Sequence, residues 1–484
     1  SAFKRLRLSR TNAVTNDKPS ATTDAATEQQ LYAIRQKIQP RAVHGVFANW
    51  RVALVLLTQT LYYGMPWLQW DHRQAVLFDL AARKFYIFGL VFWPQDFVYL
   101  TGLLILSALS LFLFTAVAGR LWCGYACPQT VYTEIFMWVE NWLEGDHLAR
   151  RKLDQSPWNA NKLRKRGLKH VVWFAIALWT GFTFVGYFTP IQTLAAETIQ
   201  ASLGPWETFW ILFYAFATWG NAGFMREQVC KYMCPYARFQ SVMFDSDTLT
   251  VTYDSSIGEP RGPRSKKTDY KAAGLGTCVD CEVCVQVCPT GIDIRNGLQY
   301  ECIGCAACID GCDQIMDKMG YPRGLIRYTT ENVVKGKYPD TGIVRHVLRP
   351  RTIIYTVLLT LIAGAFLYSL ATRVPLNVSV VRDRAALSKE TDEGKIENVY
   401  RLQIINKDGQ AHRYAIRAHG IEDLELETAT RDIAAAPLQT IDIPVSLTAD
   451  PEELKGRSIA VTFTIQATDD PRIRQDVATK FFNR

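Results

Sequence analysis

Several motifs are missing from this 484-residue chain, and each absence narrows the range of functions. The chain has no glycine-rich nucleotide-binding fingerprint, so the sequence does not identify a nucleotide as the electron donor. None of its cysteine motifs has the Cys-x-x-Cys-His form that attaches haem covalently. The seven histidines are scattered, and none stands beside a cysteine pair. We therefore expect neither a covalent haem nor a metal site built from histidines.

Basic residues are absent from one loop and abundant in others. Loop 189–204 has no Lys or Arg, whereas the segment before residue 50 and the loop around 150–169 are rich in both. The positive-inside rule then places the N-terminus in the cytoplasm and, after five crossings, the C-terminus outside. Most of the net charge of +8 is therefore explained by the basic residues of the predicted cytoplasmic segments. No folded basic module is apparent, so we expect no nucleic-acid partner.

Long apolar runs are concentrated in five segments. Each approaches the roughly 20 residues that cross a bilayer core, and their aromatic ends favour membrane spans over buried helices of a soluble protein. The predicted spans are 50–70, 97–119, 171–188, 205–224 and 352–371. A sixth apolar stretch, 84–93, is too short to cross and is expected at the membrane interface. The polar segment 1–48 has no recognisable cleavable signal and is expected to form a cytoplasmic tail.

The segment after the last span contains no cysteine. It consists of about seven short alternating stretches separated by turn residues, from "LNVSVVRDR" to "DVATKFF", which predicts an immunoglobulin-like β-sandwich. We expect no redox chemistry in this segment. Docking to a periplasmic partner, or holding the assembly in register, is the expected use.

Eight of the twelve cysteines form two ferredoxin-like motifs, "CVDCEVCVQVCP" and "CIGCAACIDGCD". Both have the C-x2-C-x2-C-x3-C spacing of a bacterial [4Fe–4S] site, in which three thiolates reach one cube and the fourth reaches the other. Asp313 replaces the proline expected after Cys312. The crossed pattern predicts one cube on Cys278, Cys281, Cys284 and Cys312, and a second cube on Cys302, Cys305, Cys308 and Cys288.

The other four cysteines form two Cys-x-x-x-Cys-Pro motifs, "RLWCGYACPQTVY" and "REQVCKYMCPYARF", each at the cytoplasmic end of a predicted span. If the helices continued through the motifs, each pair would project from one helix face, although Pro128 and Pro235 predict a bend or helix end. The repetition suggests a duplicated half-unit that brings four thiols together. The candidate copper or thiol redox residues are Cys123, Cys127, Cys230 and Cys234.

Three roles remain open for these four thiols. As thiolates they suit a soft metal such as Cu(I), and nearby Arg120, Arg226, Lys231 and Arg238 would favour the charged sulfur. As thiols they could form disulfides, although i,i+4 geometry on an intact helix is poor for a bridge. The third role is that of inert, buried cysteines.

The order of these features resembles one family. A Cys-Gly-Tyr-x-Cys-Pro-Gln-Thr-Val stretch, a Cys-x-Tyr-x-Cys-Pro-Tyr-Ala-Arg-Phe-Gln stretch, "CPTGIDIRNGLQYECIGCAACIDGCD", a last span and a β-rich tail are similar to bacterial cytochrome c oxidase accessory proteins called CcoG, FixG or RdxA. The resemblance implies an inner-membrane protein with two [4Fe–4S] clusters on the eight ferredoxin cysteines. It also implies reduction of Cu(II) to Cu(I) for assembly of a cbb-type oxidase.

Two alternative functions remain open besides copper reduction. One is an electron-transfer subunit of a quinol-oxidising chain without a metal substrate, and the other is a non-enzymatic copper chaperone or assembly scaffold. The predicted partners are copper ions, assembly factors of cbb-type cytochrome c oxidase, an unidentified electron donor, membrane lipid and, as an alternative to a monomer, a second copy in a homodimer.

The predicted fold is a polytopic α-helical membrane protein with an inserted bacterial-type ferredoxin domain and a C-terminal immunoglobulin-like β-sandwich. Its predicted parts are a cytoplasmic tail (1–48), a four-span membrane domain (49–245), a cytoplasmic 2[4Fe–4S] domain (246–350), a last span (351–372) and a periplasmic domain (373–484).

Overall fold

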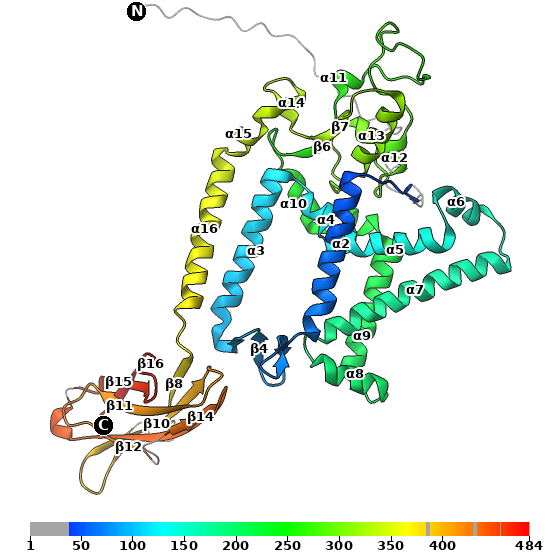
Figure 1. The fold of residues 1–484 in the computed structure, drawn as a ribbon. Helices are drawn as coiled ribbons and strands as arrows, with labels where there is room; N and C mark the ends of the chain where they lie inside the picture. Colours follow the sequence, from blue (N-terminus) through cyan, green and yellow to red (C-terminus); the bar gives the residue numbers. More distant parts are fainter. Residues whose placement is uncertain (1–37, 384–387, 429–432, 455, 484) are drawn as a thin grey trace, which may run out of the picture.

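A computed structural model describes residues 38–383, 388–428, 433–454 and 456–483. Most of the predicted N-terminal tail, residues 1–37, lies outside the described residues. A group of long helices occupies the middle of the molecule, with the cysteine-rich segment at one end and a β-sandwich at the other (Figure 1). The cysteine-rich segment and the cysteine-free sandwich are therefore separated by the length of the helices.

Three described helical segments have the length and apolar composition to cross a membrane, and they cover most or all of the second, third and fifth predicted spans. They are Pro94–Ala118, which includes α3 (Phe97–Ala118), α7 (Ala160–Val185) and α16 (Pro350–Ala371). The first predicted span is largely the 19-residue helix α2 (Val46–Gly64). The fourth is α9 (Pro205–Thr218), which continues directly into the π-helix η3 (Trp219–Met225). Five spans therefore remain a prediction, of which three are supported by the helices themselves.

Helices α3 and α16 lie side by side (Figure 1). The Tyr99 hydroxyl donates to the Ser369 carbonyl oxygen at 3.2 Å. A Cβ on Gly102 would come within 2.9 Å of the Phe366 ring, so the missing side chain lets the two helices approach closely. This pair forms one of the two helical groups of the molecule.

The other helical group is built on α5 (Pro128–Glu144), α7, α9 and η3. Phe136 of α5 stacks on Trp173 of α7 with ring centroids 5.0 Å apart, and both side chains are buried. A Cβ on Gly181 would come within 2.3 Å of the Ile211 carbonyl oxygen, so α7 and α9 meet backbone to backbone. The connecting helices are α6 (His147–Gln155) and α8 (Ile191–Ile199).

Short strands cover the ends of α2 and α3 that point away from the cysteines. The apolar stretch 84–93 forms two of them, pairing in the order β3-β4-β5. Its aromatic and β-branched side chains suit strands of a small sheet, and whether this sheet lies at the membrane interface stays a prediction. The strands are β1 (Gln69–Trp70), β2 (Arg73–Gln74), β3 (Val76–Asp79), β4 (Lys84–Ile87) and β5 (Leu90–Phe92).

The cysteine-rich segment folds around a two-stranded antiparallel sheet in which Thr250 pairs with Thr329. Its core contains Val251, Ile309 and Met316 together with several of the cysteines. The elements are α10 (Pro235–Met243), β6 (Thr250–Tyr253), α11 (Ser255–Gly258), α12 (Val283–Gln286), α13 (Ala307–Met319), β7 (Ile326–Thr329), α14 (Glu331–Val334) and α15 (Ile343–Val347).

The C-terminal segment is a sandwich of two antiparallel sheets. One has the order β12-β14-β10-β8, with β9 also on β10, and the other has the order β13-β11-β15-β16. All seven predicted alternating stretches form strands, and two further short strands complete the sheets. The bounds are β8 (Leu376–Arg382), β9 (Lys389–Glu390), β10 (Ile396–Asn406), β11 (His412–His419), β12 (Glu425–Thr428), β13 (Ile433–Ala435), β14 (Thr440–Ala449), β15 (Ser458–Ala467) and β16 (Arg474–Phe482).

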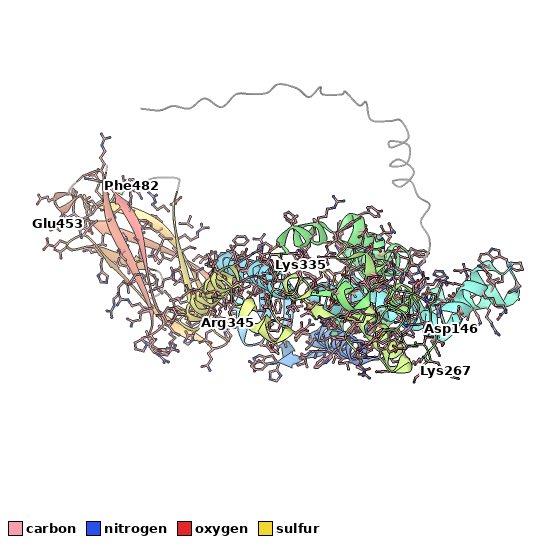
Figure 2. The ribbon with its side chains drawn as sticks, turned by 90° about the horizontal axis from the view of Figure 1, so that it is seen from above. Asp146, Lys267, Lys335, Arg345, Glu453 and Phe482 are labelled. Atoms are coloured by element: carbon pink, nitrogen blue, oxygen red, sulfur yellow. The ribbon has the colours of Figure 1, made fainter. Side chains whose placement is uncertain are left out.

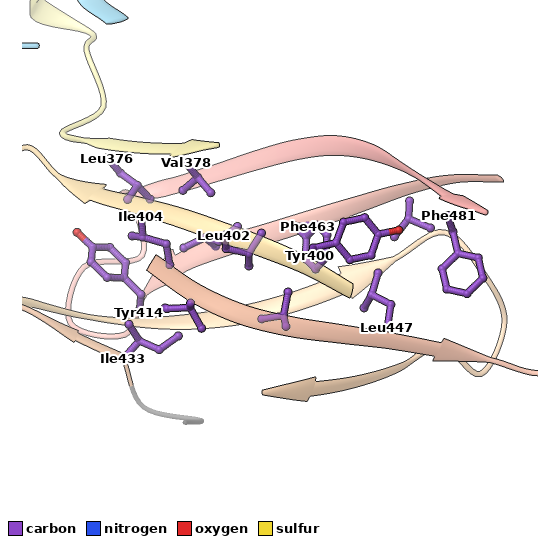
Figure 3. Packing of buried hydrophobic residues seen from close by; sticks show 14 of the residues in the cluster. Leu376, Val378, Tyr400, Leu402, Ile404, Tyr414, Ile433, Leu447, Phe463 and Phe481 are labelled. Atoms are coloured by element: carbon purple, nitrogen blue, oxygen red, sulfur yellow. The ribbon is translucent and has the colours of Figure 1, made fainter. Parts of the chain in front are cut away.

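Figure 3 shows why this alternation produces a sandwich. Leu402, Ile404 and Phe463 point between the two sheets and are fully buried. In β10, inward residues alternate with partly exposed ones over most of the strand, as a sheet with one buried face requires. The immunoglobulin-like fold is therefore encoded locally by period-two patterning.

One ionic junction attaches the sandwich to the start of α3. The Asp96 carboxylate accepts from Arg373, which follows α16, at 2.7 Å, and from Lys407 of the sandwich at 2.8 Å. All three side chains are at most 12% exposed. Viewed from above, the sandwich with Glu453 and Phe482 lies at the opposite end of the molecule from Asp146 (Figure 2).

Candidate iron–sulfur and thiol sites

The first ferredoxin-like loop brings three cysteines together with one from α13. Asp280 and Glu282 both have positive φ (55°), which turns the chain sharply around Cys281. Burial raises the pKa of Cys312, and the nearby Cys284, Cys281 and Cys278 sulfurs raise it further. Cys312, the last cysteine of the second motif, therefore lies beside the three leading cysteines of the first motif.

The second loop makes the reciprocal arrangement. Gly304 (φ 68°) and Ala306 (φ 60°) are left-handed, and the Gly304 amide donates to the Cys302 sulfur at 3.4 Å. Burial raises the pKa of Cys302 to about 12, and the neighbouring Cys305 and Cys288 sulfurs also raise it. The structure thus groups Cys288 with the second motif.

A cavity lined by cysteines lies next to this loop, where a cube would bind. It is lined by Ile303, Pro289, Thr290 and other residues of both motifs, including Cys284, Cys288, Cys302, Cys305 and Cys308. Soft thiolates around a small apolar chamber suit an iron–sulfur cluster. When bound, such a cluster supplies one-electron transfer; the chain's contribution is to hold four sulfurs in place and to exclude water.

Neither Cys-x-x-x-Cys-Pro motif is a continuous helix. Cys123 lies in α4 (Leu121–Tyr125), but Cys127 is extended (φ −63°, ψ 127°) and precedes Pro128, the first residue of α5. Cys230 lies in a second π-helix, η4 (Val229–Met233), and Cys234 is likewise extended before Pro235. Proline disfavours helical geometry at the preceding residue, so each pair spans a helix break rather than one helix face.

The two motifs repeat each other's backbone in detail. The Cys127 amide donates to the Trp122 carbonyl oxygen, and the Cys234 amide donates to the equivalent Val229 oxygen. Four residues before each first cysteine, the chain adopts the same unusual conformation, at Gly119 (φ 54°, ψ −113°) and Arg226 (φ 42°, ψ −112°). The structure therefore contains the duplicated unit that the sequence suggests.

Buried amide side chains fasten one unit to the other. Gln129 of the first unit donates to the Asn221 and Arg226 carbonyl oxygens at 3.0 and 3.1 Å. Gln240 of the second unit is fully buried and accepts from the Cys123 thiol at 3.3 Å. These reciprocal contacts hold the four cysteines on one shared site, which we call the four-cysteine site.

A buried carboxylate supports the second unit. Glu140 of α5 is 2% exposed and accepts from Arg226 at 2.7 Å and from Arg150 at 2.9 Å. Lys169 lies 3.6 Å from the same carboxylate. Burial alone would raise the pKa of Glu140, but the cations, led by Arg226, hold it below its usual value. This anchor fixes Arg226 in its positive-φ conformation, which is rarely adopted by residues other than glycine.

The cations near the four-cysteine site do not make its thiols acidic. Burial raises the pKa of Cys123 to about 12, with Cys127, Cys230 and Cys234 adding to the shift, and Arg120 opposes it only in part. Burial likewise raises the pKa of Cys230 to about 11. The expectation that nearby Arg and Lys would favour the thiolate is outweighed because the sulfurs are removed from water.

The four-cysteine site touches the second ferredoxin-like loop directly. A Cβ on Gly124 would come within 2.8 Å of the Gly304 carbonyl oxygen and 2.9 Å of the Cys305 Cα. Arg120 donates to the Cys302 carbonyl oxygen at 3.0 Å, to the Tyr300 carbonyl oxygen, and to the Ala237 carbonyl oxygen at 2.5 Å. One guanidinium thus ties together both duplicated units and the ferredoxin domain.

The packing around this contact gives the three cysteine groups an order. Cys123 and Cys230 pack on the cluster of buried side chains that contains Ile303 and Cys305. The group of Cys288, Cys302, Cys305 and Cys308 therefore adjoins the four-cysteine site on one side. On another side it shares a cavity with Cys284, which belongs to the group of Cys278, Cys281, Cys284 and Cys312.

Within the described ranges, which include all twelve cysteines, no three Cys, His, Asp or Glu side chains are close enough to hold a single metal ion. This applies equally to the ferredoxin-like loops and to the four-cysteine site.

The sequence did not predict roles for Gln129, Gln240 or Glu140. The one available signal was for Glu140, a charged residue on the apolar face of the amphipathic helix α5.

Comparison with known proteins agrees with this geometry. A family model described as a 4Fe-4S dicluster domain matches residues 225–331, one described as a 4Fe-4S binding domain matches residues 100–153, and one described as an IG-like fold at the C-terminal of FixG matches residues 366–484. The cysteine sites and the sandwich define the class: an iron–sulfur electron-transfer protein with candidate membrane helices and an immunoglobulin-like domain.

Full-length relatives place the chain more narrowly. It is 35% identical to the nitrogen fixation protein FixG of Rhizobium meliloti over 99% of this chain and 98% of the relative. It is 40% identical to Protein RdxB and 41% identical to Protein RdxA of Cereibacter sphaeroides, covering 88% and 81% of this chain and 90% and 84% of the relatives. The chain belongs to the FixG/CcoG/RdxA family.

Among solved structures, a FixG-related protein from Vibrio parahaemolyticus is 28% identical and covers 23% of this chain and 97% of its own, with a TM-score of 0.21.

Proposed function

We propose that this protein is a cupric reductase of the bacterial inner membrane, which passes single electrons through its ferredoxin-like cysteine sites and the adjoining four-cysteine site to Cu(II), and supplies Cu(I) for assembly of a cbb-type oxidase. The observation that carries the proposal is the direct contact of the four-cysteine site with the Cys302–Cys308 loop through Gly124 and Gly304. Adjacent sulfur sites allow an electron to pass without leaving the protein.

Access for a small cation supports copper as the substrate. A cavity reaching Cys230 is also lined by Glu227, Glu134 and Met137. A larger cavity of about 200 Å³ shares Arg51, Glu134, Met137 and Pro289 with it. Carboxylate oxygens accept Cu(II), and the Met137 thioether sulfur favours the softer Cu(I), so this lining suits both oxidation states in turn.

The orientation is part of the proposal. With the N-terminus and ferredoxin domain in the cytoplasm, an electron donor of the cytoplasm reduces the cysteine-bound clusters, each Cu(II) takes one electron, and the sandwich lies in the periplasm. The alternatives are a quinol-oxidising chain and a non-enzymatic copper scaffold. They differ from the proposal in whether quinol reduces the clusters and whether Cu(II) oxidises them.

The test uses full-length protein purified anaerobically, reduced with dithionite and freed of excess reductant. Adding Cu(II) with a Cu(I)-specific chelator should reoxidise the clusters and form one Cu(I) for each electron lost. Reoxidation by a quinone with no response to Cu(II) would favour the quinol chain. Clusters that neither dithionite nor any donor reduces would favour the scaffold. Either result would contradict the proposed reductase.

A further inference from the structure

We propose that Cys123, Cys127, Cys230 and Cys234 hold a third [4Fe–4S] cluster, in series with the two clusters of the ferredoxin-like loops. The inference goes beyond copper reduction, because it concerns the resident group of the four-cysteine site whichever acceptor follows it. It rests on four observations: the count of cysteines in the matched segments, the contacts between the two cysteine pairs, the duplicated backbone and the surrounding charge.

After the two ferredoxin-like cubes take eight of the twelve cysteines, the remaining four are enough for one more cube. The 4Fe-4S binding model matches residues 100–153, where Cys123 and Cys127 are the two cysteines present. The dicluster model matches residues 225–331, which contain ten cysteines, two more than its two cubes need. The two extra cysteines are Cys230 and Cys234. The surplus pair of one segment therefore completes the incomplete set of the other, and the structure places both pairs on one site.

The two cysteine pairs form one group. Gln240 of the second unit accepts from the Cys123 thiol at 3.3 Å, and Cys123 and Cys230 pack on the same buried cluster. Four thiolates on one tetrahedral ion lie about 4 Å apart, given metal–sulfur bonds of about 2.3 Å, and a four-iron cube holds its ligands farther apart than one ion does. Within the described residues no three metal-ligating side chains form a single-ion site, either here or in the ferredoxin-like loops.

The backbone positions the sulfurs in two matching pairs. In each unit a helical turn presents the first cysteine, and an extended second cysteine precedes a proline that starts the next helix. Two such pairs related by duplication supply four ligands from two sides, one for each iron of a cube. Because Cys127 and Cys234 are extended, each pair spans the helix break instead of crowding one helix face.

Part of the negative charge of a cube would be offset by its surroundings. A cube with four thiolates carries net negative charge, and the N-termini of α5 (17 residues) and α10 (9 residues) begin directly after Cys127 and Cys234. Positive ends of helix dipoles stabilise such charge. Arg120, three residues before Cys123, donates to the carbonyl oxygen of Ala237, three residues after Cys234. These groups offset charge that iron-bound thiolates would bring, although Arg120 does not make the free Cys123 thiol acidic.

The experiment is an iron and sulfide count on full-length protein, isolated anaerobically in detergent without chemical reconstitution. Three cubes predict about 12 irons and about 12 sulfides per chain, and two cubes predict about 8 of each. The double variant Cys123→Ser/Cys127→Ser should lose about four irons and keep the spin-resonance signals of the two ferredoxin-like clusters. Tyr232→Phe, an exposed change between Cys230 and Cys234, is the matched control and should keep the parental count.

A parental count of about 8 irons that the double variant leaves unchanged would overturn the third cluster. So would a copper ion, stoichiometric in the isolated protein and absent from the double variant. The parental count decides the question even if the variant folds poorly. A protein with three cubes that fails to reduce Cu(II) would contradict only the proposed function, and a two-cube protein that reduces Cu(II) would contradict only the third cluster.

Discussion

The two sets of cysteines in this molecule reach their sites by different routes. Eight of them lie within one short segment, 278–312, where left-handed residues and fixed spacing turn a loop around its own cavity. The other four come from two segments far apart in the chain and meet only because α5 packs on η3 and α10 packs on α3. A loop motif thus carries its geometry with it, whereas the four-cysteine site depends on tertiary contacts.

The largest expected effect comes from breaking the local site itself. Cys305→Ser removes a buried sulfur from the loop that lies between the other two cysteine groups. We expect the loss of that cluster and a fall of Cu(I) formation to background, measured by iron content and by the Cu(I) chelator. Lys267→Ala, an exposed change in the same domain, should leave both unchanged. Normal Cu(I) formation by Cys305→Ser would show that electrons bypass this loop.

Next in size is a change far from any sulfur. Glu140→Gln removes the charge that pairs with Arg150, Arg226 and Lys169 in a buried site. Breaking a buried ion pair from one side typically costs about 3–5 kcal/mol, so we expect a lower melting temperature in detergent. The four-cysteine site should lose its occupant while the ferredoxin-like loops keep theirs.

The matched control for Glu140 is Glu422→Gln, which changes an exposed carboxylate in the sandwich and should not alter melting. Equal losses of iron from all three cysteine groups in Glu140→Gln would remove the distinction between the local and the tertiary sites.

A smaller effect is expected at the contact between the two kinds of site. Gly124→Ala places a methyl group within 2.8 Å of the Gly304 carbonyl oxygen, so the two loops must move apart. Overpacking of this kind costs about 1–3 kcal/mol. We expect full iron content but slower reoxidation of the clusters by Cu(II) in stopped-flow absorbance. Gly167→Ala, with no atom near its new Cβ, should react at the parental rate; equal rates for both variants would show that this contact does not limit transfer.

The smallest effect is expected in the sandwich, a region whose pH response owes nothing to sulfur. His412 lies between Asp469 (2.6 Å) and Asp408 (3.0 Å). Burial lowers the pKa of His412, but the two carboxylates outweigh it and raise the pKa above 6.5. This stabilisation is complete below the unfolded pKa of about 6.5 and is lost as pH rises through the folded pKa.

Hydrogen exchange of the β11 amides in the intact protein measures this response. Protection should fall modestly as the pH rises through the folded pKa of His412, after correction for the intrinsic exchange rate. In His412→Gln the corrected protection should not change over that range. A parental profile that is equally flat would show that the two carboxylates do not stabilise the charged ring.

Much of the fold follows from local patterns that the sequence displays. The ferredoxin-like spacing predicted the loops, and period-two alternation predicted seven of the nine strands described in the sandwich, because both signals lie within a few adjacent residues. The helix breaks at Cys127 and Cys234 were foreshadowed by Pro128 and Pro235. These features need no knowledge of distant contacts.

Other features depend on partners that no local pattern identifies. The π-helices around Arg226 form where Glu140, from another helix, holds the guanidinium. Gln129 and Gln240 look like ordinary polar residues until the two units face each other. The low acidity of Cys123 follows from burial, which outweighs the nearby Arg120 that the sequence makes visible.

The Asp96 junction gives the sandwich a mechanical connection to the far end of the molecule. Asp96 immediately precedes α3, whose 22 residues form a rod of about 33 Å that ends just before Gly119 and the Cys123 turn. A displacement of Lys407 would therefore be passed to α3 as a tilt or shift of one continuous rod. Through this rod the sandwich would act on the segment that carries Cys123, at the other end of α3.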